Sequence, residues 1–165
     1  MTQWTSLFFE HFSLAMLLIA IVIIIIHSFF SKLPLPEIVF RWVVLLALGF
    51  TGIYTFIMHA FFPESAAANI GWVDSPFQFE VAMADLTIGV LGIIAFKASD
   101  GFRLATIIAS LCWLWGDAVG HVRQMIIQQN FAPGNAGSWF WIDIIVPLIL
   151  LIAFIKLKRV TSKIG

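Results

Sequence analysis

The sequence predicts an all-α fold, a polytopic membrane helix bundle with five transmembrane helices in a single domain that covers residues 1–165. Charged residues make up 11% of the chain and hydrophobic residues 61%, whereas ordinary globular chains carry about 25% charged residues. So few charges cannot cover a water-exposed surface. Five segments also have the roughly 20 mostly apolar residues that cross a bilayer as a helix. The net charge is zero, which gives no attraction to nucleic acid, and the lipid bilayer is the expected partner.

The apolar segments predict spans over residues 12–31, 37–62, 76–98, 102–128 and 139–159. The first follows a stretch without Lys or Arg, unlike a secretory signal, and is expected to be retained as a helix. Pro34 and Pro36 suit a turn and the start of the second span. Pro76 suits the first turn of the third.

The fourth span contains Gly116 and Gly120, small residues that are expected to permit close approach of a neighbouring helix. The fifth begins at "WFWIDIIVPLILL", and Pro147 is expected to kink it. Between the second and third spans, "PESAAAN" is typical of a short interfacial helix that Gly71 would end. Before the fifth span, "APGNAG" predicts a turn.

The basic residues predict the orientation, because Lys and Arg concentrate on the cytoplasmic side of membrane proteins. With the C-terminus inside, only Arg123 of the nine basic residues falls towards the outside. The N-terminus is therefore expected outside, in a multi-pass protein of a bacterial or archaeal cytoplasmic (inner) membrane. The eight residues expected inside are Lys32, Arg41, Lys97, Arg103, Lys156, Lys158, Arg159 and Lys163.

Ionisable residues recur in the outer half of four of the predicted spans. Each costs about 2.5–3.5 kcal/mol at a helix centre on insertion scales, which makes each a candidate functional residue. With a rise of about 1.5 Å per residue, Asp85 and Asp117 are the deepest. The six candidates are His59, Glu80, Asp85, Asp117, His121 and Asp143.

Asp117, His121 and Gln124 share one face of the fourth span at the spacing i, i+4, i+7. Helical bundles build metal centres from carboxylate and imidazole ligands on facing helices, and such ligands suit zinc, copper or iron better than calcium. The sequence thus predicts a transition-metal site formed by His59, Glu80, His121 and Asp117. Supporting or proton-relay roles fall to Asp85, Asp143 and Gln124. A haem held by two histidines is a less favoured variant.

Two alternatives remain open. In the first, the protein is a proton-relay or transport protein in which Asp85 and Asp117 carry protons. In the second, it is an accessory subunit of a larger membrane complex, or a homo-oligomer, with a purely structural polar core. Glu80 and Asp85 lie about 140° apart around their helix, which counts against one ion bound by both. These patterns do not distinguish an enzyme from a metal-binding chaperone or a transporter.

Two segments carry a resemblance to known sequences. They are "HAFFPESAAANIGWVDSPFQFEVAMADLTIGVLGI" and "GHVRQMIIQQNFAPGNAGSWFWIDIIVPLIL". Over residues 45–155 the chain resembles a family of small, uncharacterised bacterial and archaeal integral membrane proteins, a domain of unknown function. The resemblance implies a multi-spanning fold and directs attention to His59, Glu80, His121 and Asp143. It also implies that position 117 varies, and it supplies no activity.

Overall fold

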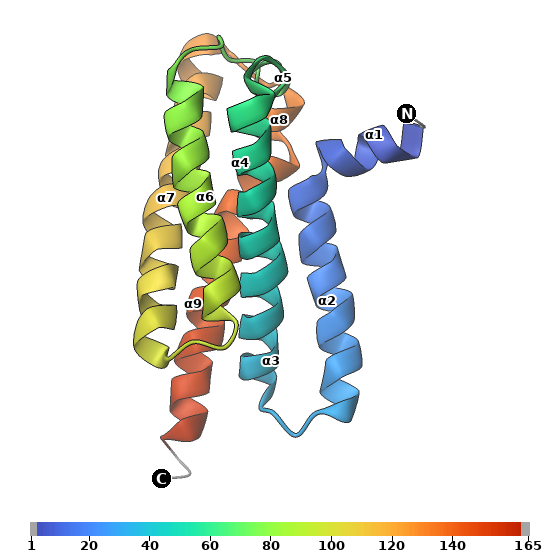
Figure 1. Cartoon of the computed structure of the whole chain (residues 1–165), viewed down its shortest axis with the longest axis vertical. Helices are drawn as coiled ribbons and strands as arrows, with labels where there is room; N and C mark the ends of the chain where they lie inside the picture. Colours follow the sequence, from blue (N-terminus) through green and yellow to red (C-terminus); the bar gives the residue numbers. More distant parts are fainter. Residues whose placement is uncertain (1–2, 163–165) are drawn as a thin grey trace.

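A computed structural model describes the backbone of residues 3–162, and the side chains of residues 7–160 and 162. Every regular element in this part of the chain is a helix (Figure 1). Five helical segments are long and apolar enough to cross a membrane. They are α2 (Phe12–Phe30), the continuous helix Leu35–Phe61, α6 (Phe77–Ala95), α7 (Asp100–Gln128), and α9 (Ser138–Thr161), which follows the one-turn helix α8 (Pro133–Ala136).

The second long helix has three parts: α3 (Leu35–Trp42), the π-helix η1 (Val43–Phe50) and α4 (Thr51–Phe61). The predicted number of long apolar helices is confirmed, and each helix begins and ends within a few residues of its expected place. Helix α1 (Gln3–Glu10) was not predicted; it leaves the bundle at an angle to α2 (Figure 1).

The two ends of the bundle differ in composition. One end, the cap end, carries α5 (Pro63–Ile70) and α8 (Figure 1). The opposite end, the basic end, carries the α2–α3 and α6–α7 turns and the C-terminal end of α9. Seven of the basic residues lie at that end, namely Lys32, Arg41, Lys97, Arg103, Lys156, Lys158 and Arg159. Lys163 lies outside the described residues.

Helix α5 forms as its sequence predicts. Pro63 occupies the first turn, where a missing N–H costs no hydrogen bond. Gly71 ends the helix with φ of 73°, a left-handed conformation that favours glycine. The N–H groups of Gly71 and Trp72 donate to the carbonyls of Ala68 and Ala67 at 3.1 and 2.9 Å. The chain thereby turns sharply towards α6 across the cap end.

Two glycine pairs bring η1 and α4 against α6. A Cβ atom on Gly52 would lie 2.7 Å from Cα of Gly89, and one on Gly92 would lie 2.8 Å from Cα of Gly49. Only glycine allows backbones to approach this closely. These pairs fix the crossing of the second and third spans.

The expectation for Gly116 and Gly120 was wrong. A Cβ on Gly116 would meet nothing within 4 Å, and one on Gly120 would meet only the Trp72 ring at 4.0 Å. Gly116 lies on the outward face of α7. Small residues alone do not predict which helix face meets a neighbour.

The hydrophobic core lies mainly towards the basic end. Phe40, Val44, Ile107, Val146 and Leu150 are fully buried there. By contrast, α2 exposes large apolar side chains, as a helix in lipid does, including Leu18, Val22, Ile25 and Ile26. The fully buried apolar side chains therefore pack mostly in the basic half of the bundle, whereas the cap half contains the candidate site.

Candidate functional site

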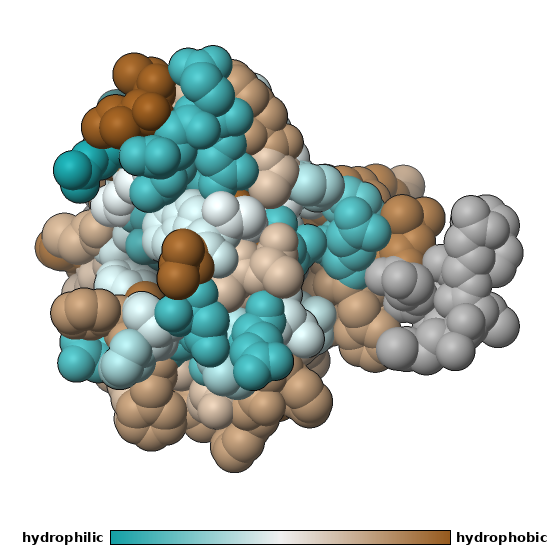
Figure 2. Space-filling model, turned by 90° about the horizontal axis from the view of Figure 1, so that it is seen from above, coloured by the Kyte–Doolittle hydropathy of each residue, from teal (hydrophilic) through white to brown (hydrophobic). Residues whose placement is uncertain are grey.

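A cavity of about 510 Å³ occupies the cap half of the bundle. Side chains from α4, α6, α7 and α9 form its walls, and α5 and the segment after it contribute at the cap end. Its volume falls within the range of about 300–1,000 Å³ typical of small-molecule sites. Ala47, Leu48, Ile88, Leu114 and Ile142 supply apolar wall. Figure 2 looks onto the cap end and shows hydrophilic and near-neutral residues over its middle, with most hydrophobic residues towards the rim.

Three carboxyl groups from three different helices face this cavity. Asp85 comes from α6, Asp117 from α7 and Asp143 from α9. The three lie within electrostatic range of one another. Among the described residues that line the cavity, none is Lys or Arg. The cavity wall therefore carries acidic groups without a permanent positive charge beside them.

The surroundings of Asp85 and Asp117 differ. Asp85 is buried and accepts a hydrogen bond of 3.0 Å from the indole N–H of Trp113. In the described part of the chain, no protein group donates a hydrogen bond to Asp117. The carboxyl group of Asp117 is thus more available to a ligand than that of Asp85.

Asn135 fixes the orientation of His121. The amide nitrogen of the fully buried Asn135 donates to the carbonyls of His121 and Asn130, at 3.3 and 2.9 Å. Its oxygen therefore accepts from the indole of Trp72 at 3.2 Å and from Nδ1 of His121 at 2.8 Å. Carbonyls only accept and indoles only donate, so this network places the hydrogen on Nδ1. Nε2 is left to face Oδ2 of Asp143 at 3.7 Å.

The second cavity histidine, His59, lies on α4 across from this network. Its Nδ1 contacts Oε1 of the buried Gln78 at 2.5 Å. Asp85 lies within electrostatic range of the same imidazole. Two histidines and three aspartates therefore share one cavity on four helices.

The structure brings five of the seven predicted site residues to the cavity but not Glu80 or Gln124. Glu80 is exposed and does not line the cavity, because its position on α6 is about 140° from that of Asp85. The expected convergence of Glu80 with the two histidines was wrong. Gln124 lies one turn beyond His121, where its carbonyl accepts the N–H of Asn130 at the end of α7. The five residues in the cavity are His59, Asp85, Asp117, His121 and Asp143.

The predicted transition-metal site receives no support from this geometry. Within residues 3–162, no group of three or more His, Cys, Asp or Glu side chains is arranged to hold a metal ion. A tetrahedral or octahedral site needs its ligands at one point. Here the ionisable side chains are spread around the cavity wall instead.

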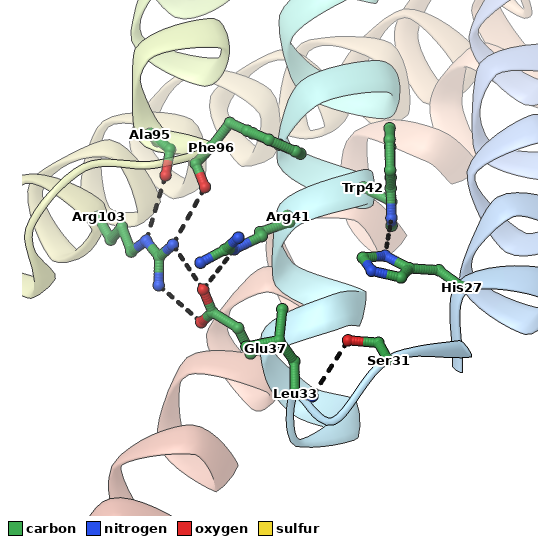
Figure 3. A network of polar contacts seen from close by, with 9 residues as sticks. All are labelled: His27, Ser31, Leu33, Glu37, Arg41, Trp42, Ala95, Phe96 and Arg103. Atoms are coloured by element: carbon green, nitrogen blue, oxygen red, sulfur yellow. Dashed lines mark hydrogen bonds and ion pairs between the residues drawn. The ribbon is translucent and has the colours of Figure 1, made fainter. Parts of the chain in front are cut away.

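A buried ion-pair network closes the basic end (Figure 3). Arg103 on α7 binds both carboxylate oxygens of Glu37 on α3, at 2.8 and 2.9 Å. The same guanidinium donates to the carbonyls of Ala95 and Phe96, which end α6. Arg41 adds a 2.5 Å contact to Glu37. Together with the core, this network separates the cavity from the basic end.

Three of these residues, Asn135, Glu37 and Arg103, have no signal in the sequence. Asn135 lies in "APGNAG", where Pro and Gly predict a turn and give no sign that the amide is buried. Glu37 and Arg103 lie at predicted span ends, where charged residues normally face water. Their pairing joins positions 66 residues apart, and no local pattern signals it.

Comparison with protein-family models matches residues 10–163 to a family of unknown function (DUF6790), so the match covers nearly the whole chain. Comparisons with curated proteins and with solved structures give no match.

Proposed function

Because the chain belongs to the DUF6790 family, whose function is unknown, we propose a function from the cavity itself: the protein binds an organic cation there and transports it in exchange for protons. This develops the transport alternative of the sequence analysis. The protein is a multi-pass membrane protein by the length and composition of its helices.

One observation carries the proposal. Asp85, Asp117 and Asp143 face one cavity whose described lining contains no Lys or Arg. Ionised carboxylates in a site of low polarity need a compensating positive charge. A bound cation provides it, and protons provide it when the cation leaves. The apolar wall favours an organic cation over a small hydrated ion, and the nearby rings of Trp72 and Trp139 suit cation–π contact.

The orientation is part of the proposal. Seven described basic residues lie at the basic end, and Lys and Arg favour the cytoplasmic side. We therefore place the basic end and the C-terminus inside, and the cap end and N-terminus outside, in a bacterial or archaeal cytoplasmic membrane. The cavity then belongs to the outer half of the membrane.

The transition-metal hypothesis is the weaker candidate. It needs ligands at one point, whereas the described residues form no such group. Elemental analysis of protein purified without added metal separates the two hypotheses. Stoichiometric zinc, copper or iron would favour the metal site over the cation site.

The first experiment compares two probes of the same shape and opposite charge. Purified protein in detergent is equilibrated with radiolabelled tetraphenylphosphonium or with tetraphenylborate. We expect saturable binding of the cation and none of the anion, because the cavity wall is acidic. Equal binding of both probes would mean that only apolar contact is involved, and the proposal would fail.

The second experiment removes one carboxylate at a time without changing its shape. Asp117→Asn should weaken binding of tetraphenylphosphonium about 10- to 100-fold, since interactions with charged groups contribute about 1.5–3 kcal/mol. Glu80→Gln is the matched control: it removes an acidic residue from the same half of the bundle but outside the cavity. If both variants bind equally well, Asp117 has no part in the site.

A further inference from the structure

The side of the cavity between α4 and α9 is closed by the N-terminal segment of the chain. These two helices make no extensive contact with each other. The junction of α1 and α2, residues 9–12, bridges them instead, and Phe9 and Glu10 line the cavity together with Tyr54 of α4 and Trp139 of α9. We call these bridging contacts the latch. Part of the cavity wall is thus made by the N-terminal junction and not by the spanning helices around it.

Aromatic rings form the apolar part of the latch. The ring of Tyr54 lies parallel to that of Phe12 at 4.1 Å between centroids. Phe9 and Trp139 lie nearly parallel to the same ring, each at 6.2 Å. These contacts join the N-terminal junction to α4 and α9 without interlocking the backbones.

Three hydrogen bonds form the polar part. The Tyr54 hydroxyl donates to the carbonyl of Phe9 at 3.0 Å, and the Trp139 indole donates to that of Glu10 at 2.8 Å. Both carbonyls lie in the last turn of α1, where a helix lacks partners of its own. Nδ1 of His11 contacts the Ser138 hydroxyl at 2.9 Å. All three bonds can break without disturbing a helix ladder.

The cap end is closed differently. The Asn130 amide donates to the carbonyls of Ile70 and Gly71, at 2.9 and 3.2 Å. A Cβ on Gly134 would lie 2.6 Å from the carbonyl oxygen of Asn69, so the α5 and α8 segments meet backbone against backbone. The cap is therefore held partly by close backbone packing, whereas the latch is held by side chains of Tyr54, Trp139 and His11.

Helix α1 also has the exposed surface of a membrane-bound segment. Leu7, Phe8 and Phe9 are 46%, 40% and 46% exposed, and α1 extends away from the bundle (Figure 1). Exposed aromatic and aliphatic side chains on a short helix suit the boundary between headgroups and acyl chains. The latch accordingly lies where the bilayer meets the cavity.

We propose that the latch is a lateral gate through which amphipathic cations dissolved in the membrane reach the cavity. The inference rests on the proposed cation-binding function and narrows its ligands to lipophilic cations. The exposed carboxylate of Glu10 at the gate attracts the charge, and the rings of Tyr54 and Trp139 accommodate the apolar part by aromatic packing. The cation moves from bilayer to cavity without crossing bulk water.

A reversible cross-link tests the gate. His11→Cys and Ser138→Cys, combined with Cys112→Ala, are joined by a short bifunctional thiol reagent with a reducible spacer. In proteoliposomes, cross-linking should slow association of radiolabelled tetraphenylphosphonium at least about tenfold by rapid filtration, and reduction should restore the rate. The single variant His11→Cys in the Cys112→Ala background is the control. An unchanged rate after complete cross-linking would mean that the cation uses another route, and the gate would be refuted.

Removal of one latch hydrogen bond tests the opposite direction. Trp139→Phe removes the bond to Glu10 and should speed association several-fold. Trp115→Phe is the matched control, because it also removes an indole bond to a backbone carbonyl, that of Ile144 at 3.3 Å, outside the cavity. Equal rates in the two variants would contradict the gate. If the unmodified protein bound no tetraphenylphosphonium at equilibrium, the cation site itself would instead be refuted.

Discussion

At the scale of single residues, two histidines are held in opposite tautomers. The Asn135 oxygen accepts from Nδ1 of His121, which places the hydrogen on Nδ1. The indole of Trp42 donates to Nδ1 of His27 at 2.9 Å, which places the hydrogen of the neutral ring on Nε2. His121 faces the cavity, whereas His27 lies near the basic end (Figure 3). The protein thus presents a defined lone pair to Asp143 in the cavity.

Nitrogen chemical shifts of labelled imidazoles test this assignment. At a pH where both rings are neutral, His121 should show the Nδ1–H pattern and His27 the Nε2–H pattern. Asn135→Leu should abolish the preference at His121, because it removes the acceptor, and leave His27 unchanged. It should also lower the free energy of unfolding by about 2 kcal/mol, since it strands buried polar groups. The same tautomer at both histidines in the unaltered protein would contradict the network.

The depth of a residue in its predicted span identifies it as a candidate site residue, but it does not predict whether the side chain faces the bundle interior or the outside. An ionisable residue far inside an apolar run must avoid lipid. This rule correctly predicted that Asp85, Asp117 and His121 face the bundle interior. Glu80 lies close to a helix end, where water can reach either face, so its depth does not decide its direction. The buried Asn135 gave no signal, because an amide in a Pro-Gly turn is normally exposed.

At the scale of elements, the spans follow from the length of the apolar runs alone. Helix α1 escaped prediction because its eight residues are too few for an isolated helix. Its last turn is held by Tyr54 and Trp139, residues far along the chain. Helix pairing likewise depends on which glycines contact a neighbouring helix. The sequence does not distinguish Gly52, which makes such a contact, from Gly116, which does not.

The glycine contact between α4 and α6 leads to a stability prediction. Gly52→Ala puts a methyl group 2.7 Å from the backbone of Gly89, so the helices must move apart. We expect the free energy of unfolding to fall by about 1–3 kcal/mol, as in overpacked cores. Gly116→Ala, with nothing within 4 Å, should be neutral or gain up to about 1 kcal/mol from helix propensity. Thermal unfolding in detergent measures both, and an equal loss in the two variants would contradict the crossing.

At the scale of the whole molecule, the proposed exchange of cations for protons leads to a pH dependence. Protons and the cation compete for the carboxyl groups of Asp85, Asp117 and Asp143, with His59 and His121 facing the same cavity. The affinity for tetraphenylphosphonium should therefore fall as the pH is lowered, because protonated carboxyl groups no longer attract it. By linkage, binding should release protons.

Calorimetry in two buffers of different ionisation enthalpy measures that release. The apparent binding enthalpy should differ between the buffers in proportion to the protons released. Asp117→Asn should reduce the number released, whereas Glu80→Gln should not. Identical enthalpies in both buffers would mean that binding is not coupled to protons, and the exchange mechanism would be wrong.

The cavity in the cap half and the hydrophobic core in the basic half shape the electric field across the membrane. In the proposed orientation, a polar cavity extends the outside potential inwards, so most of the voltage falls across the packed half. A monovalent charge that crosses that half gains or loses about 2.3 kcal/mol for every 100 mV. The Glu37–Arg103 pair lies at the basic end of this packed half. Because Arg41 also pairs with Glu37, the network of two guanidinium groups and one carboxylate carries one net positive charge, and the voltage therefore exerts a net force on it.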